Sequence, residues 1–263
     1  MAETSDISWT DATFNPWIGC AKVSPGCDHC YAERSTPSRT MKILWGPQEQ
    51  RKRTSAGNWG QPVRWNAAHS DFFAAHGRRR RVFCASLADV FDNRADPQWR
   101  RELWELIRVT PNLDWLLLTK RIGNVAGMLP ADWGRGYDNV WLGISVVNQE
   151  EVRRDVYKLV SVPARIRWLS MEPLLEAVSF EGVFADQGSA VDRSNLLERI
   201  DWVVAGGESG PAPRLVPEEA YENLRDQCDA VGIPYFYKQR GGKTKEKGGC
   251  LLGGVEVKAW PAV

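Results

Sequence analysis

Three cysteines near the N-terminus are the residues of this chain best suited to chemistry. Cys20, Cys27 and Cys30 lie in a loop that contains Gly, Pro and Ser and follows a short apolar stretch. Cysteine thiolates are the usual protein ligands of iron–sulfur clusters. Three ligands leave one coordination position open, which is typical of catalytic rather than structural metal sites. The loop therefore predicts a reactive metal centre.

Other uses of these cysteines fit the sequence less well. A structural zinc site needs a fourth ligand, which His29 or a distant cysteine could supply: Cys84, Cys228 or Cys250. A disulfide framework is disfavoured because three clustered cysteines are an odd number and no secretory signal precedes them. Cys–His nucleophilic catalysis does not require three cysteines. A non-catalytic module that binds zinc or an iron–sulfur cluster and recognises nucleic acid stays open as the alternative.

The composition is that of an ordinary globular protein. The chain has 263 residues, of which 43% are hydrophobic and 25% charged. A net charge of +1 gives no overall attraction for nucleic acid. No apolar run approaches the roughly 18 residues that a membrane span needs. Six cysteines without an export signal lead us to expect a reducing cytoplasm.

Short apolar runs alternate with segments of helical character along most of the chain. Such runs are typical of parallel strands buried on both faces. We expect strands at Phe14–Ile18, Arg81–Ser86, Trp115–Thr119, Val140–Ser145, Ile166–Ser170, Trp202–Ala205 and Tyr235–Tyr237. We expect helices at Pro97–Val109, Glu150–Leu159 and Pro217–Val231.

This βα alternation predicts an α/β fold with a parallel sheet. Six or seven strands are too few for a closed eight-stranded barrel, so we expect a partial (βα)6–7 TIM-like barrel. No boundary or repeat divides the sequence, and residues 1–263 are predicted to form a single domain. A loop-rich insertion is expected near residues 36–66, and Phe180–Asn195 is expected to be another excursion.

Polar residues follow nearly every expected strand. Ligands in βα folds gather at the carboxyl ends of the strands, so these residues are candidates for binding a cofactor. Thr119, Lys120 and Arg121 follow one strand, and Lys238 and Gln239 follow another. The candidates that we select for cofactor binding are Ser86, Asp89, Ser145, Glu172, Gly206, Gly207 and Glu208. For each residue the alternative is a helix cap or an ion pair.

Basic segments offer a possible surface for a polyanion. Arg78–Arg81 precede one expected strand, and Arg51–Arg53 lie near Trp45, Trp59 and Trp65. Such a charge run is usually a solvated face, and the functional alternative is contact with phosphates. The nearby tryptophans would suit base stacking.

Several short motifs together resemble a known family. The run Phe14–Cys20 with Cys27 and Cys30 is similar to the start of a radical S-adenosylmethionine (SAM) type bacteriophage protein family with a WNP-x-x-GC signature. The resemblance continues through Ser170–Leu174, Ala205–Gly210 and Tyr237–Gln239. Six residues separate the first two cysteines here, where most radical SAM enzymes have three.

The resemblance implies a function. Cys20, Cys27 and Cys30 would hold a [4Fe–4S] cluster whose open iron binds SAM, and SAM cleavage would give a 5′-deoxyadenosyl radical that abstracts hydrogen from a substrate. His29 stands where the family has an aromatic residue against adenine. The family also implies an external one-electron donor, flavodoxin- or ferredoxin-like. The substrate is expected to be a nucleic acid base or nucleotide, in DNA modification or repair.

Overall fold

A computed structural model describes residues 5–183, 195–243 and 248–262. The chain divides into two compact units. The first contains the chain up to Val23, Cys30–Leu142 and Pro163–Arg165, and the second contains Ser24–His29, Gly143–Val162 and the chain from Ile166 onward. Whether these units make one domain, as the sequence leads us to expect, stays a prediction.

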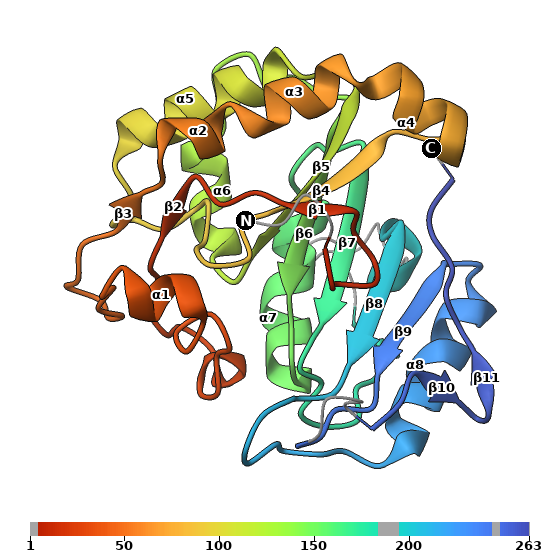
Figure 1. Ribbon diagram of the computed structural model, residues 1–263. Coiled ribbons are helices and arrows are strands. Elements are labelled where there is room, and N and C mark those ends of the chain that lie inside the picture. The colour runs from red at the N-terminus through yellow and green to blue at the C-terminus, as the bar shows by residue number, and fades with distance from the viewer. Residues whose placement is uncertain (1–4, 184–194, 244–247, 263) are drawn as a thin grey trace. The chain divides into compact units, whose positions relative to one another are not determined.

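The central feature is a seven-stranded sheet in the order β1-β4-β5-β6-β7-β8-β9 (Figure 1). The pairs β1–β4, β4–β5, β7–β8 and β8–β9 are parallel. In the described part of the chain β1 and β9 are the ends of the order, so the sheet is not closed. The structure confirms the α/β class and the partial barrel. The strands are β1 (Ala12–Thr13), β4 (Arg80–Cys84), β5 (Leu113–Thr119), β6 (Val140–Ser145), β7 (Ile166–Met171), β8 (Trp202–Gly206) and β9 (Tyr235–Gln239).

The apolar strands are buried as their composition predicts. Every residue of β6 and β8 is buried. Four consecutive strands of the sheet each carry one fully buried tryptophan: Trp115, Trp141, Trp168 and Trp202. Much of the unusual tryptophan content therefore serves the core, where large aromatic side chains bury the most apolar area.

The expected N-terminal strand is wrong in extent. Only Ala12–Thr13 joins the main sheet, whereas β2 (Trp17–Ile18) pairs antiparallel with β3 (Lys52–Arg53) in a separate ribbon. Pro16 lies between the two parts and has no N–H to donate to a ladder, so the strand is interrupted there.

The region expected to be a loop-rich insertion is helical at both ends, and residues 41–55 between them contain no helix. It contains α1 (Thr36–Thr40), α2 (Ala56–Trp59) and α3 (Gln61–Ala67). Ser35 and Ser55 cap α1 and α2 through their hydroxyls, and prolines occupy the first turns of α1 and α3. The Ser and Pro residues that resemble loop signals are therefore helix starts.

The longer helices match the expected segments to within a few residues. They are α5 (Pro97–Arg108), α7 (Gln149–Val160) and α8 (Glu218–Ala230). Asp96 caps α5 and Asn148 caps α7. The sequence analysis missed α4 (His69–His76), α6 (Ile122–Met128) and the hairpin of β10 (Leu251–Leu252) and β11 (Val255–Glu256). Most of the excursion expected at Phe180–Asn195 lies outside the described residues. No helix within the described ranges has the length and apolarity to span a membrane.

Gly143 in β6 tests how tightly the second unit is packed. A Cβ added there would lie 2.3 Å from Cε2 of the Trp168 ring, too close for real atoms. We expect Gly143→Ala to lower the free energy of unfolding by about 1–3 kcal/mol through overpacking. Denaturant unfolding measures this change.

Gly123 in α6 supplies the matched control, because a Cβ there meets nothing within 4 Å. Gly123→Ala should be neutral or stabilising by up to about 1 kcal/mol. Equal stability of the two variants would contradict the close packing of Gly143 against Trp168.

Candidate metal and cofactor site

The three cysteines of the N-terminal loop are all free and half-buried. Cys20 and Cys30 belong to the first unit, and Cys27 belongs to the second. Within the described residues, no three His, Cys, Asp or Glu side chains are already arranged to hold a metal. The assignment of these cysteines as ligands stays a prediction. Cys84 and Cys228, by contrast, are buried singly.

Gly19 sets the backbone conformation of the chain directly before Cys20. Gly19 has a φ of +112°, and a Cβ there would lie 3.2 Å from Cδ of Arg51 and 3.3 Å from Cγ2 of Ile43. Because glycine has no Cβ, it tolerates both the positive φ and the close neighbours at this position. The Gly19 N–H donates to the carbonyl of Leu87 at 3.1 Å, which ties the loop to the segment after β4.

Cys27 ends a short 3₁₀ turn, Pro25–Cys27. The Ser24 hydroxyl accepts a hydrogen bond from the Gly26 N–H at 3.1 Å, and the Ser24 carbonyl accepts one from the Cys27 N–H at 2.9 Å. The turn is therefore held by its own cap rather than by a preceding element.

Arg121 contacts Cys20 directly. Its Nη1 lies 3.2 Å from Sγ of Cys20 and 3.1 Å from Oδ2 of Asp89, and its Nη2 donates to the Ala21 carbonyl at 2.9 Å. The sequence placed Arg121 at a strand end, and this contact gives it a role there.

Burial raises the pKa of the Cys20 thiol to about 11, with a further increase from Asp89, while Arg121 opposes the change. A thiol in this setting is protonated at neutral pH. Metal coordination displaces the thiol proton.

Asp89, an expected cofactor ligand, already bonds to several groups of the protein. Its carboxylate accepts hydrogen bonds from the Thr119 hydroxyl at 2.8 Å, the Lys120 N–H at 3.1 Å and the Phe91 N–H at 2.9 Å, besides its ion pair with Arg121. Its side chain is buried. Asp89 therefore connects the segment after β4 to the segment after β5.

Ser86 also has partners within the first unit. Its hydroxyl accepts from Nδ2 of Asn15 at 2.9 Å, and its carbonyl accepts from the hydroxyl of Tyr31 at 3.0 Å. Tyr31 directly follows Cys30, so the segment after β4 holds this part of the cysteine loop too.

Two buried donors near the loop have no hydrogen-bond partner in the described part of the chain: Nη2 of Arg51 and Nε1 of Trp45. Trp45 and Cys30 pack against the same apolar cluster, Ile18, Ala32 and Leu87. Arg51 Nη1 donates to the carbonyl of Gly46, whose N–H in turn donates to the carbonyl of Cys20. The surroundings of Cys20 and Cys30 are therefore rich in donors.

In the second unit, Glu208 is the centre of an ion-pair network. Its Oε2 lies 2.9 Å from Nδ1 of His29 and accepts from Nε of Arg214 at 3.0 Å, while Nη2 of Arg214 donates to Oε1 at 2.5 Å. Burial would raise the pKa of Glu208, but the hydrogen bonds from Arg214 and His29 lower it to about 2. Glu208 is therefore a carboxylate at any ordinary pH.

Arg214 extends the same network to the segment that carries Cys27. Its Nη1 pairs with Asp28 at 3.2 Å, and its Nη2 donates to the Pro25 carbonyl at 3.0 Å. The sequence analysis missed Arg214, because a single arginine between prolines has no distinguishing pattern. We call Glu208, Arg214, Asp28 and His29 the Arg214 clasp.

The two glycines after β8 have packing reasons of their own. A Cβ at Gly207 would lie 1.8 Å from the carbonyl oxygen of Arg240, and one at Gly206 would lie 2.9 Å from Oε1 of Glu172. Glu172 pairs with Lys238 at 2.8 Å. Ser145 donates weakly to the Glu172 carbonyl at 3.4 Å. These expected cofactor residues lie together, and close packing accounts for both glycines without a ligand.

The basic segments differ from the solvated patch considered above. Arg51 is buried and pairs with Asp92 at 2.6 Å, and Arg81 is buried with its guanidinium 5.5 Å from the Trp141 ring. Arg78 forms two hydrogen bonds to Asp11, at 2.6 and 2.8 Å. Two of these arginines are therefore buried, and Arg78 is paired within the fold.

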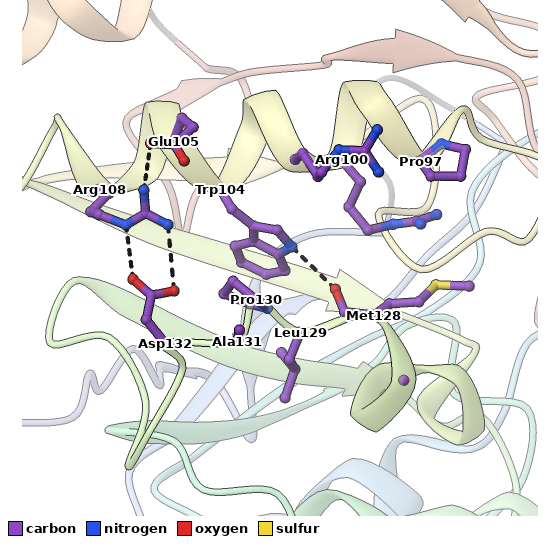
Figure 2. Close-up of a pocket in the computed structure, with 12 residues that line it drawn as sticks. Pro97, Arg100, Trp104, Glu105, Arg108, Met128, Leu129, Pro130, Ala131 and Asp132 are labelled. Carbon is purple, nitrogen blue, oxygen red and sulfur yellow. Dashed lines mark hydrogen bonds and ion pairs between the residues drawn. The ribbon is translucent and has the colours of Figure 1, made fainter.

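A separate cavity of about 490 Å³ lies between α5 and the end of α6 with the segment that follows it (Figure 2). Trp104 donates to the Met128 carbonyl at 3.1 Å beside it, and Arg108 pairs with Asp132 at 3.1 Å. Its lining contains no residue proposed above for cofactor or metal: Pro97, Arg100, Arg101, Trp104, Glu105, Arg108 and Gly127–Asp132.

Three solved structures of spore photoproduct lyase are similar to this chain. A variant with bound AdoMet and dinucleoside spore photoproduct has a TM-score of 0.44 and 11% identity, over 85% of this chain and 62% of that one. Two other variants have TM-scores of 0.48 and 0.46 and identities of 11% and 10%, each over 88% of this chain and 64% of theirs. The chain thus spans less than two thirds of these lyases.

No curated protein matches the chain. One family model does, and it covers residues 4–261. Its description is "Protein of unknown function (DUF5131)". Because the match covers nearly the whole sequence, the chain belongs to the DUF5131 family.

Proposed function

We propose that this protein is a radical SAM enzyme, related to the radical-SAM-type bacteriophage proteins, and that Cys20, Cys27 and Cys30 hold a [4Fe–4S] cluster. The observation that carries the proposal is the set of three free, half-buried thiols on one loop, one of them contacted by a buried arginine. When bound, such a cluster and SAM supply hydrogen-atom abstraction from an unreactive C–H bond.

The donors around the loop fit an anionic, sulfur-rich group. Arg121 already donates toward Sγ of Cys20, and the buried N–H groups of Arg51 and Trp45 lack acceptors in the described structure. A buried donor without an acceptor costs about 1–3 kcal/mol. Sulfide and thiolate sulfurs are acceptors of the kind that these donors need.

The Arg214 clasp supports a role for the second unit in binding SAM. It holds one ring nitrogen of His29, whose side chain remains 35% exposed and is therefore able to stack on adenine. Six further residues would contribute to the SAM site through their position: Ser86, Asp89, Ser145, Glu172, Gly206 and Gly207. Several of them already have hydrogen-bond or ion-pair partners within the protein, so their part is to shape the site. An external one-electron donor, flavodoxin- or ferredoxin-like, completes the proposal.

Replacement of the ligands tests the cluster. After anaerobic reconstitution, wild type should be brown and contain about four irons and four sulfides per chain. Cys20→Ala, Cys27→Ala and Cys30→Ala should each lose most of this iron. The proposed cluster has only three protein ligands, so each substitution leaves two irons without one.

Cys84→Ala and Cys228→Ala are the controls, since both thiols are buried, unlike the three of the loop. They should keep the iron content of wild type. A colourless protein with one zinc per chain would contradict the enzyme and favour the nucleic-acid module. Equal iron loss in Cys84→Ala would refute the ligand assignment.

SAM binding has a spectroscopic test. Adding SAM to the reduced, reconstituted protein should change its electron paramagnetic resonance spectrum and slowly release 5′-deoxyadenosine. His29→Ala should weaken the SAM-dependent change without loss of iron, because His29 is not one of the three ligands. An intact cluster with neither response would indicate electron transfer or a structural role.

For the substrate we propose a nucleic acid base or nucleotide. Internal use of Arg51, Arg78 and Arg81 argues against a broad phosphate-binding face and supports a small nucleotide or a locally held base. Oligonucleotide affinity should therefore depend weakly on salt. The slope of log affinity against log salt should be much shallower than that of a protein that neutralises several phosphates, which is about −0.7 to −0.9 per phosphate. A steep slope across a salt series that disappears on replacing Arg79 and Arg80 would show that the basic run binds a polynucleotide.

A further inference from the structure

Arg121 occupies a constrained position in the first unit. It directly precedes α6, two residues after the end of β5, and its N–H donates to the Thr119 hydroxyl at 2.8 Å. Its side chain is only 9% exposed. Burying a guanidinium is costly, so its acceptors indicate what the residue is for.

These acceptors belong to two groups. Asp89 supplies a carboxylate oxygen at 3.1 Å, and the cysteine loop supplies Sγ of Cys20 at 3.2 Å and the Ala21 carbonyl at 2.9 Å. A neutral thiol is a weak acceptor, whereas hydrogen bonds to an ionised partner are roughly twice as strong. The arrangement is therefore better suited to a coordinated thiolate than to a free thiol.

Asp89 is itself immobilised. Its hydrogen bonds to the Thr119 hydroxyl and the Lys120 N–H fix the carboxylate against the backbone that leads into Arg121. Arg121 is thus held at its backbone N–H by Thr119 and at its guanidinium by Asp89. A rigid donor can orient a ligand sulfur in a way that a mobile surface arginine cannot.

We propose that Arg121 is a positioning residue for the cluster: held by Asp89, its guanidinium donates to Sγ of Cys20, retains the cluster and raises its reduction potential. The inference rests on the proposed function. Hydrogen bonds to cluster sulfurs and nearby charge set the potential of iron–sulfur centres. A nearby cation stabilises the reduced, more negative form, so its loss should make the potential more negative.

Two substitutions separate charge from geometry. Arg121→Met removes the charge and every donor at similar length, and Arg121→Lys keeps the charge but cannot reach Cys20, Ala21 and Asp89 together. Arg100→Met is the matched control. The Arg100 guanidinium is also buried in the first unit, but it donates to the carbonyls of Val90 and Asp92, at 2.8 and 2.7 Å.

The measurements are iron loss to a chelator and the midpoint potential of the reconstituted cluster, with circular dichroism to check folding. We expect Arg121→Met to lose iron about 10–100-fold more readily than wild type, as loss of a partner of a metal ligand usually does. Its potential should be more negative than that of wild type. Arg121→Lys should be intermediate in both, and Arg100→Met should match wild type. If Arg121→Met does not fold, the lysine variant carries the comparison.

Different results overturn different statements. A wild-type protein that takes up no cluster overturns the proposed function and this inference with it. A wild-type cluster whose iron retention and potential are unchanged in both Arg121 variants overturns the role of Arg121 alone. Equal changes in Arg100→Met would show that the effect is general destabilisation, which also refutes the proposal.

Discussion

A charge buried at a strand end must be paired, and this constraint organises both units of the protein. Asp89 and Glu208 are both buried carboxylates, and each is paired with an arginine from a following segment. Removing one partner of such a pair leaves an uncompensated buried charge, at a cost of about 3–5 kcal/mol. Each arginine is therefore held where its carboxylate lies, and its remaining N–H groups have a fixed direction.

The same constraint explains why some arginines of the basic runs do not lie on the surface. Arg51 needs Asp92 because both side chains are buried, and the half-buried Arg78 pairs with Asp11. Arg81 is covered by Trp141, where a cation over an aromatic face is stabilised by the ring quadrupole. A run of like charges in the sequence says only that the charges are close along the chain, and the fold decides which of them reach water.

The sequence could predict the elements whose pattern is set by burial. Val140–Ser145 is a continuous apolar run and is a strand over the same residues, and Pro97–Arg108 has the period of a one-sided helix. It could not predict short helices made of caps and prolines, such as Thr36–Thr40, because these residue types are shared with turns. The residues selected for their place at a strand end lie at or after β4, β6, β7 and β8, and their role as cofactor ligands stays a prediction. The partners of these residues could not be predicted, because Arg214 and Glu208 come together only through a turn, and a turn has no periodicity in the sequence.

One motif of support is used twice. In the first unit Arg121, oriented by Asp89, donates to the Ala21 carbonyl beside Cys20; in the second, Arg214, oriented by Glu208, donates to the Pro25 carbonyl two residues before Cys27. Backbone carbonyls are acceptors whatever the side chain, so both arginines fix the course of the loop rather than the identity of its residues. The turn at Pro25–Cys27 also has its own Ser24 cap, so the arginine bonds add to order that the loop already has locally. The ion pairs at the strand ends hold both arginines in the positions from which they donate to these carbonyls.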